Sequence, residues 1–350
     1  MESLKQIWES GWLTNMGTFH NRLEEELTNY LGVKYLSLFC NGTIALMTAL
    51  KALDIKGEVI TTPYSFVATA HAIVWNDLTP VFVDVLPENG NMDPDKIEEA
   101  ITANTSAIMP VHVYGNPCEV DKIQEIADKQ KLKIIYDAAH AFGVKKDGIS
   151  ILNYGDLSVL SFHATKVFNT IEGGAIICHT ISMKRKIDQL RNFGYDINDQ
   201  INRIGINGKL NEFQSAIGLL NLNRIDALIG RRKEIFEYYN INLKNIKGIH
   251  GIDINSSVDH NYSYYPIFID EEFPFSRDQL YDRYTSKGIF PRKYFFPLIS
   301  NFNIYSKYAS SQKENLVNAN RLANQVLCLP IYPQLTNEEI EEVISIIKGK

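Results

Sequence analysis

The sequence contains only four cysteines in 350 residues, and no two of them form a CxxC pair. They stand far apart, at Cys40, Cys118, Cys178 and Cys328. Zinc ribbons and disulfide-stapled secreted domains need closely spaced cysteines, so this spacing excludes both classes. We expect reduced, partly buried thiols and predict no metal site.

Long hydrophobic runs are also missing. No uninterrupted apolar stretch reaches the length that a bilayer span requires. Residues 1–12 mix charged and apolar side chains, without the apolar core and small-residue cleavage site of a secretory signal. We therefore predict a soluble, cytoplasmic protein with no membrane partner.

Two further absences narrow the choice of ligand. The formal net charge is −6, and the lysines and arginines form no basic arm, so nucleic acid is not expected as a partner. No GxGxxG turn follows an early strand, which argues against a nicotinamide-dependent sugar dehydrogenase.

Short β-rich runs alternate with helical patterns. The expected strands are Tyr35–Phe39, Glu58–Thr61, Val81–Val85, Ala107–Val111, Lys133–Tyr136, Leu157–Phe162 and Ala175–Cys178. The expected helices are Phe19–Leu31, Thr43–Leu53, Ala68–Trp75, Pro94–Ile101 and Val120–Lys131. This alternation predicts an α/β fold with a mainly parallel sheet covered on both faces. Such sheets bind ligands beyond the carboxyl ends of their strands.

The pattern changes in the last third of the chain. A helical pattern runs from about Leu210 through Ile225 and, after a break, on to Leu243. Beyond it, Tyr262–Ile269 alternates like a strand, while Arg277–Ser286 and Asn337–Ile347 have helical spacing. We predict a large domain over residues 1–228 and a smaller C-terminal α/β domain over residues 229–350.

Lys166 ends the run Ser161–Lys166, just after an expected strand. A lone lysine in a loop is usually a solvated charge. Here Phe162, Val167 and Phe168 supply an apolar setting that disfavours the ammonium and makes the amine more reactive. Such an amine can form a Schiff base with the aldehyde of pyridoxal phosphate and can later move a proton between the substrate carbon and cofactor C4′.

Asp137 ends the apolar strand Lys133–Tyr136. One interpretation is a helix N-cap, a common role for aspartate. The small Ala138 and Ala139 that follow leave room for a flat ring, which favours a salt bridge to a pyridine nitrogen. A carboxylate there keeps the ring protonated and makes it an electron sink. His140 either stacks on or hydrogen-bonds around that ring, or is a structural histidine.

Small and hydroxyl residues follow two other expected strands. Asn41, Gly42 and Thr43 open a helix, and a helix N-terminus can hold a phosphate through its free N–H groups. Ser161 can add a hydroxyl to that phosphate, and Phe66 can cover the open face of the ring. The plainer alternatives are an ordinary strand–turn–helix and a core aromatic.

The run Asn207–Glu212 is a polar turn that enters a long helix. Plain capping accounts for it, because Asn207 is a capable N-cap, although Glu212 lies too late for a capping box. Asn211 gains a further role only from the family resemblance.

The chain resembles the DegT/DnrJ/EryC1/StrS family of sugar-nucleotide aminotransferases from about Gly11 to its C-terminus. Four motifs occur in family order: Gly11–Asn15, Tyr136–His140, Ser161–Lys166 and Asn207–Glu212. The resemblance implies a fold-type I aminotransferase with pyridoxal phosphate as cofactor. It also implies a large domain around a mixed seven-stranded sheet, a small C-terminal domain, and a homodimer with shared active sites.

The resemblance also implies roles for individual residues. The catalytic residues are Lys166, which forms the Schiff base, Asp137 and His140. The cofactor is also held by Gly42, Thr43, Ser161 and Phe66, with Asn211 reaching in from the other subunit. The expected substrate contacts are Thr14, Asn15, His163 and Tyr294.

The activity implied is transfer of an amino group from L-glutamate to a nucleotide-linked 4-keto-6-deoxy sugar, for a surface polysaccharide such as the O-antigen of lipopolysaccharide. The run Phe162–Gly174 resembles family members that aminate the 4-position of a dTDP-sugar. Two alternatives stay open: a 3-aminotransferase on a 3-keto-6-deoxy sugar nucleotide, and a cofactor-binding regulator without turnover. Lys166 argues against the dehydratases of the family, which carry histidine there.

Overall fold

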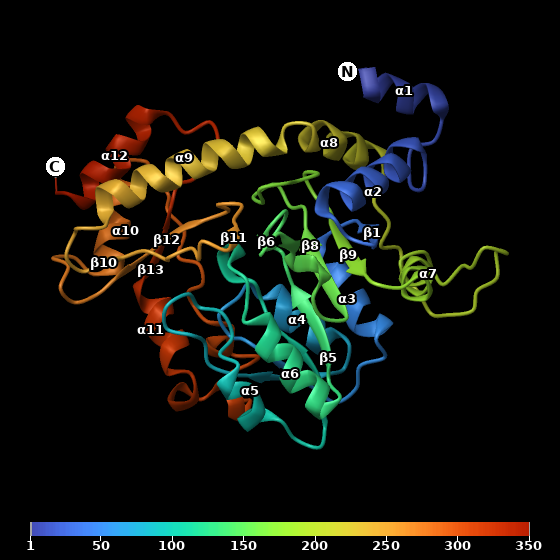
Figure 1. The fold of residues 1–350 in the computed structure, drawn as a ribbon, viewed down its shortest axis with the longest axis horizontal. Helices are drawn as coiled ribbons and strands as arrows, with labels where there is room; N and C mark the ends of the chain where they lie inside the picture. Colours follow the sequence, from blue (N-terminus) through green and yellow to red (C-terminus); the bar gives the residue numbers. More distant parts are fainter. Residues whose placement is uncertain (1, 350) are drawn as a thin grey trace.

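The computed structural model describes residues 2–349, so the outer domain limits, residues 1 and 350, lie outside the described residues. At its centre is a seven-stranded sheet with the strand order β1-β9-β8-β5-β4-β2-β3 (Figure 1). β9 runs antiparallel to both neighbours, and the other adjacent strands are parallel. The predicted mixed, mainly parallel sheet is confirmed. In spatial order its strands are β1 (Tyr35–Phe39), β9 (Gly174–Cys178), β8 (Leu157–Ser161), β5 (Lys133–Asp137), β4 (Thr105–Met109), β2 (Glu58–Thr61) and β3 (Thr79–Phe82).

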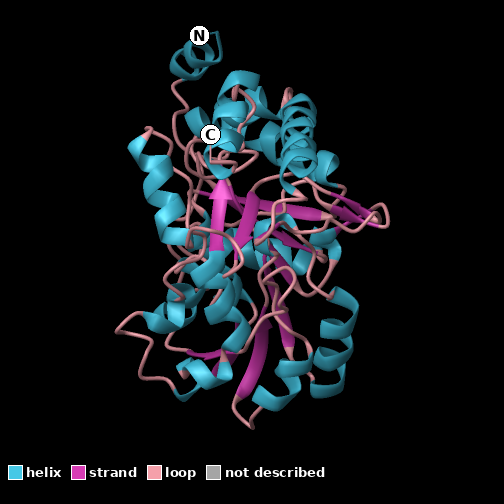
Figure 2. Ribbon diagram, turned by 90° about the vertical axis from the view of Figure 1, so that its left-hand side faces the viewer, coloured by secondary structure: helices cyan, strands magenta, loops and turns pink. Residues whose placement is uncertain are grey.

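Helices pack on both sides of this sheet (Figure 2). Those in the first two thirds of the chain are α1 (Glu2–Ser10), α2 (Thr18–Leu31), α3 (Gly42–Ala52), α4 (Ala68–Trp75), α5 (Asp95–Ala100), α6 (Val120–Gln130), α7 (Ile181–Leu190) and α8 (Glu212–Leu222). In α2, Leu23, Leu27 and Leu31 recur every four residues and are buried together. Gly32 then ends the helix with a left-handed φ of 62°.

Two strands lie earlier in the chain than the sequence predicted. β4 ends at Met109, because Pro110 has no N–H to donate to the ladder, and Val111 beyond it forms only an isolated bridge with Asp137. β3 ends at Phe82 and not at Val85, which forms only an isolated bridge with Met92. β3 carries Pro80 and lies at the sheet edge, where proline is tolerated.

The C-terminal part has its own antiparallel sheet, in the order β10-β12-β13, and a separate hydrophobic core. Its elements are α9 (Ile225–Leu243), β10 (Ile249–His250), β12 (Tyr265–Ile269), α10 (Arg277–Ser286), α11 (Val317–Gln325), β13 (Val326–Leu329) and α12 (Asn337–Ile347). A third small sheet joins β11 (Val258–Asp259) to β6 (Lys145–Lys146) and β7 (Ile149–Ser150).

The long helix α9 connects the two parts (Figure 1). Ile225 at its start packs in the core of the large sheet, whereas Ile235, Phe236 and Tyr239 pack in the C-terminal core. We propose that the domain boundary lies between residues 228 and 229, within this helix.

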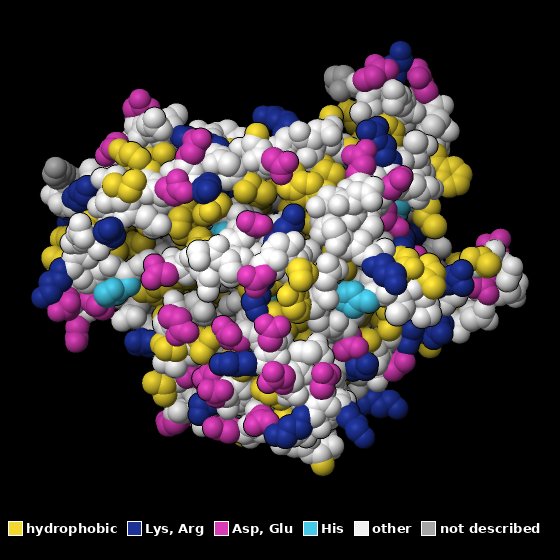
Figure 3. Space-filling model, viewed as in Figure 1, with side chains coloured by type: hydrophobic (Ala, Val, Ile, Leu, Met, Phe, Trp, Pro, Cys, Tyr) yellow, Lys and Arg dark blue, Asp and Glu magenta, His cyan; other side chains and the backbone are white. Residues whose placement is uncertain are grey.

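The surface mixes charges of both signs. Figure 3 shows basic and acidic side chains interspersed over the face it presents. Between residues 2 and 349, no helix combines the length and the apolarity needed to cross a membrane.

Candidate active site

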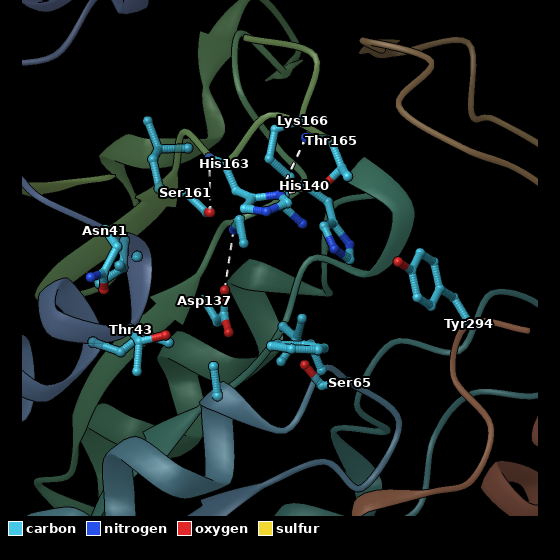
Figure 4. A pocket seen from close by; sticks show the side chains of 18 of the residues that line it. Asn41, Thr43, Ser65, Asp137, His140, Ser161, His163, Thr165, Lys166 and Tyr294 are labelled. Carbon is cyan, nitrogen blue, oxygen red and sulfur yellow. Dashed lines mark hydrogen bonds between the residues drawn. The ribbon is translucent and has the colours of Figure 1, made fainter. Parts of the chain in front are cut away.

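The parallel pairing of β5 with β8 brings the strand-end residues Asp137 and Ser161 to the same edge of the sheet. A cavity of about 470 Å³ opens there. Lys166 and Asp137 face this space, with Thr43 and Ser161 on one side and Tyr294 on the other (Figure 4). Nine of the predicted site residues line it: Gly42, Thr43, Phe66, Asp137, His140, Ser161, His163, Lys166 and Tyr294.

Asp137 is a buried carboxylate at the cavity wall. Its Oδ2 accepts a hydrogen bond of 2.8 Å from the Thr69 hydroxyl, and its Oδ1 accepts one of 3.2 Å from the Ala139 N–H. Burial raises the pKa of Asp137, while these hydrogen bonds and the charge of Lys166 oppose that shift. An ionised carboxylate in this position would be stabilised by a cationic partner in the cavity, which a protonated pyridine ring provides.

Lys166 lies in the loop after β8, and its Nζ is 3.4 Å from the phenolic oxygen of Tyr264. Burial lowers the pKa of Lys166 to about 8, although the charge of Asp137 opposes the shift. At pH 7 about a tenth of this amine is therefore neutral and nucleophilic, as attack on an aldehyde requires.

The lowered pKa of Lys166 predicts how cofactor capture depends on pH. Below about 8 the neutral fraction of the amine falls about tenfold per pH unit, and above about 8 it saturates. We expect the rate constant for capture of pyridoxal phosphate by apoprotein to follow this profile, measured by stopped-flow absorbance. A rate that still climbs steeply through pH 10 would show that Lys166 titrates like a solvated lysine.

His140 forms another wall of the cavity and is buried. Its Nδ1 accepts the Tyr114 N–H at 3.2 Å, which places the ring proton of the neutral form on Nε2. Burial, together with the nearby charge of Lys166, holds the pKa of His140 well below its ordinary value. The ring stacks parallel to Phe295 at 5.8 Å, so His140 presents a neutral aromatic surface.

The start of α3 forms a cradle beside Ser161. The Asn41 side chain caps the helix by accepting the Ile44 N–H at 2.8 Å. The N–H groups of the next two residues, Gly42 and Thr43, lie in the first turn, where no intrahelical partner exists. A Cβ on Gly42 would lie 2.9 Å from Cβ of Ser161, so only glycine allows this close approach.

Three predicted residues do not line the cavity of their own chain: Asn211, Thr14 and Asn15. Asn211 caps α8 by accepting the Gln214 N–H at 2.9 Å, so the cap is Asn211 and not Asn207. Thr14 is exposed in the loop between α1 and α2, and the Asn15 carbonyl accepts the indole N–H of Trp12.

Sequence reasoning missed several residues of the site. Tyr264 lies beside the Lys166 amine although 98 residues separate them. Phe295 stacks on His140, and Thr69 holds Asp137. Glu212 also has an unexpected role, since its carboxylate accepts the N–H groups of Phe19 and His20 at the start of α2. These contacts join residues far apart in the sequence, so no local sequence pattern predicts them.

The residues present fit pyridoxal phosphate. The cavity offers an amine, a buried carboxylate for the ring nitrogen, and a helix N-terminus with a hydroxyl for the phosphate. Phe66, with 61% of its surface exposed, lies at the cavity with its ring available to cover a bound planar group.

A second cavity of about 520 Å³ lies next to the first and shares Thr165, Tyr264 and Tyr294 with it. Three cationic side chains line it: Arg232, Lys287 and Arg292. Glu339 and Glu342 also line it, so the cations outnumber the carboxylates by one. An anionic portion of a substrate bound at Lys166 can extend into this space.

Comparisons with known proteins identify the family of this chain. The model of the DegT/DnrJ/EryC1/StrS aminotransferase family matches residues 1–348. The chain is 51% identical over 345 residues to the dTDP-4-amino-4,6-dideoxy-D-glucose transaminase of Shigella dysenteriae, covering 99% of this chain and 94% of the relative. It is 50% identical over 351 residues to the transaminase of the same name from Escherichia coli, covering 100% of this chain and 95% of the relative.

Solved structures share the fold. DesI, crystallised in the presence of its TDP-sugar product, superimposes with a TM-score of 0.94 at 34% identity, covering 99% of this chain and 88% of DesI. PseC of Helicobacter pylori, an aminotransferase involved in the biosynthesis of pseudoaminic acid, gives a TM-score of 0.92 at 27% identity, covering 99% of this chain and 95% of PseC. The chain therefore belongs to the DegT/DnrJ/EryC1/StrS aminotransferase family, whose cofactor is pyridoxal phosphate.

Proposed function

We propose that this aminotransferase moves the amino group of L-glutamate to a nucleotide-linked 4-keto-6-deoxy sugar, with dTDP-4-keto-6-deoxyglucose as the acceptor. The product is then the 4-amino-4,6-dideoxy sugar nucleotide. The observation that carries the proposal is the partly buried Lys166 amine, which shares one cavity with Asp137. The names of the two relatives at about half identity support the choice of acceptor.

Bound pyridoxal phosphate supplies an aldehyde that accepts the amino group and a ring that spreads the electron pair released at the substrate carbon. Asp137 keeps the ring nitrogen protonated, which makes that delocalisation effective. Gly42, Thr43 and Ser161 hold the phosphate, and Phe66 covers one face of the ring.

Lys166 moves the proton. Its free amine would take the proton from the α-carbon of bound glutamate and deliver it to C4′ of the cofactor. Water would then release 2-oxoglutarate, and bound pyridoxal phosphate would keep the amino group for the acceptor. For the keto sugar, Lys166 would carry the proton in the opposite direction, from C4′ of the cofactor to the sugar carbon that receives the amino group. A pKa of about 8 suits a group that must both accept and donate.

The second cavity suits the nucleotide end of the acceptor. We propose that Tyr294 contacts the sugar where the two cavities meet, and that Arg292 binds the diphosphate beyond it. Arginine recognises phosphate oxygens through paired N–H donors. His163, half-exposed at the mouth of the first cavity, is the proposed second contact to the sugar.

Arg292→Ala should raise the KM for the sugar nucleotide about tenfold or more, since a charge-assisted hydrogen bond is lost. The glutamate half-reaction should keep its rate. Steady-state kinetics with each substrate varied in turn measures both effects. Lys293→Ala is the matched control, because Lys293 pairs with Asp278 and does not line the cavity. An unchanged KM in Arg292→Ala would show that Arg292 does not bind the diphosphate in this cavity.

We further propose a homodimer in which each chain completes the other's site. Asn211, Thr14 and Asn15 lie outside their own cavity and would contribute from the partner. The loop after α7 projects from the body of the molecule (Figure 1) and exposes 95% of Ile197 and 89% of Ile204. Ile201 and Ile206 of the same loop are exposed as well, and exposed apolar side chains that gather on one segment mark an interaction surface. Light scattering tests the dimer.

The function is tested by incubating the enzyme with L-glutamate and dTDP-4-keto-6-deoxyglucose and analysing the products. The proposal predicts 2-oxoglutarate and an amino sugar nucleotide in equal amounts, identified by mass spectrometry and NMR. Amination at the 3-position of a 3-keto isomer, with none at the 4-position, would favour the alternative acceptor. We place the reaction in the cytoplasm and its product in surface polysaccharide synthesis.

A further inference from the structure

Two hydroxyl groups connect Asp137 to the wall of the first cavity. The Thr69 hydroxyl donates to Asp137 Oδ2 at 2.8 Å, and the Ser65 hydroxyl lies 2.8 Å from the Thr69 oxygen. Thr69 is fully buried, and Ser65 is 5% exposed at the cavity wall. Neither residue belongs to the four family motifs.

The direction of these hydrogen bonds follows from the donors available. An ionised carboxylate only accepts, so the single hydroxyl hydrogen of Thr69 points to Asp137. Ser65 must then donate its own hydrogen to the Thr69 oxygen. With the Ala139 N–H on Oδ1, each carboxylate oxygen holds one hydrogen bond from the protein and keeps further lone pairs for a ligand.

We propose that Thr69 is a positioning residue for the cofactor: supported by Ser65, it orients the Asp137 carboxylate toward the ring nitrogen of pyridoxal phosphate and keeps it ionised. The inference rests on the proposed pairing of Asp137 with that nitrogen. It does not depend on which sugar is aminated.

Thr69 also contacts the segment that carries Phe66, the residue proposed to cover the face of the cofactor ring. Thr69 lies in the first turn of α4, and its N–H donates to the Phe66 carbonyl at 3.2 Å. Ser65 directly precedes Phe66 in the chain. A displaced Thr69 would therefore disturb both the carboxylate and the segment that carries Phe66.

The experiment compares two cofactors in three proteins. Thr69→Val keeps the shape of the side chain and removes the hydroxyl, and Thr69→Ser keeps the hydroxyl. Each is titrated with pyridoxal phosphate and with its analogue in which CH replaces the ring nitrogen. Thr69→Val should weaken binding of pyridoxal phosphate about tenfold relative to wild type, and binding of the analogue hardly at all. Thr69→Ser should restore the wild-type preference.

Other outcomes overturn the proposal. If Thr69→Val weakens the binding of both cofactors equally, Thr69 has a merely structural role. If binding of both is unchanged, Thr69 has no role in holding the cofactor. If wild type itself fails to prefer the nitrogen-containing cofactor, the pairing of Asp137 with the ring fails, while the amino transfer proposed above is tested separately by its products. Should Thr69→Val not fold, Ser65→Ala carries the test, with a selective loss of about twofold to threefold expected.

Discussion

Replacing Lys166 by alanine is expected to slow the conversion of glutamate to 2-oxoglutarate by at least about 10⁴-fold, since both the nucleophile and the proton carrier are lost. Pyridoxal phosphate should still bind, because Asp137, the α3 cradle and Ser161 are untouched. The variant should therefore take up cofactor without turning over.

This result is checked by two measurements on one preparation. Gel filtration followed by phosphate and cofactor analysis gives the bound fraction, and a coupled dehydrogenase assay gives 2-oxoglutarate. Lys146→Ala is the control, because Lys146 is a partly buried lysine that pairs with Asp121 and does not line the cavity. Wild-type turnover in Lys166→Ala would refute the mechanism, whatever the cofactor content.

Asp137→Asn should keep the fold and lose about 10²–10³ in rate, the scale of removing one preorganised electrostatic contact from a buried site. A neutral amide cannot hold the ring nitrogen protonated. The fold should survive, because an amide oxygen can still accept from Thr69 and no buried charge remains to be stabilised.

The distinction between rate and fold makes this variant informative. The midpoint temperature of unfolding of the apoprotein should change by only a few degrees, while the single-turnover rate with glutamate falls by the factor given above. Asp156→Asn is a matched control, since Asp156 pairs with Lys133 at the opposite end of β5 and does not line the cavity. A fully active Asp137→Asn enzyme would show that the ring nitrogen has another partner.

The parts of the site that sequence reasoning found are those with short-range signals. Lys166 follows the end of an apolar strand, and Asp137 precedes two alanines. Each can therefore be recognised from its neighbours in the sequence. The sheet was predictable for the same reason, since strands and helices alternate with clear periods. The ends of β3 and β4 were harder to predict. Pro110 ends β4, and β3 lies at the edge of the sheet, where only one neighbouring strand defines its length.

The rest of the site is assembled by tertiary packing. Tyr264 reaches Lys166 from the C-terminal domain, and Thr69 reaches Asp137 from α4. Neither has a neighbour in sequence that marks it, since a tyrosine in an alternating strand and a threonine in an apolar helix both look like ordinary packing residues. Asn211, Thr14 and Asn15 stay predictions that depend on a second chain.

Lys166 and its cavity are proposed to take an amino group from glutamate with the help of pyridoxal phosphate. The most direct measurement is the visible absorption spectrum of the purified protein with pyridoxal phosphate, recorded before and after addition of L-glutamate alone. We predict a yellow protein whose visible band fades as the cofactor takes up the amino group, with one equivalent of 2-oxoglutarate released per site. A protein that takes up no cofactor, or a yellow protein that glutamate leaves unchanged, would show that Lys166 does not support this amino transfer.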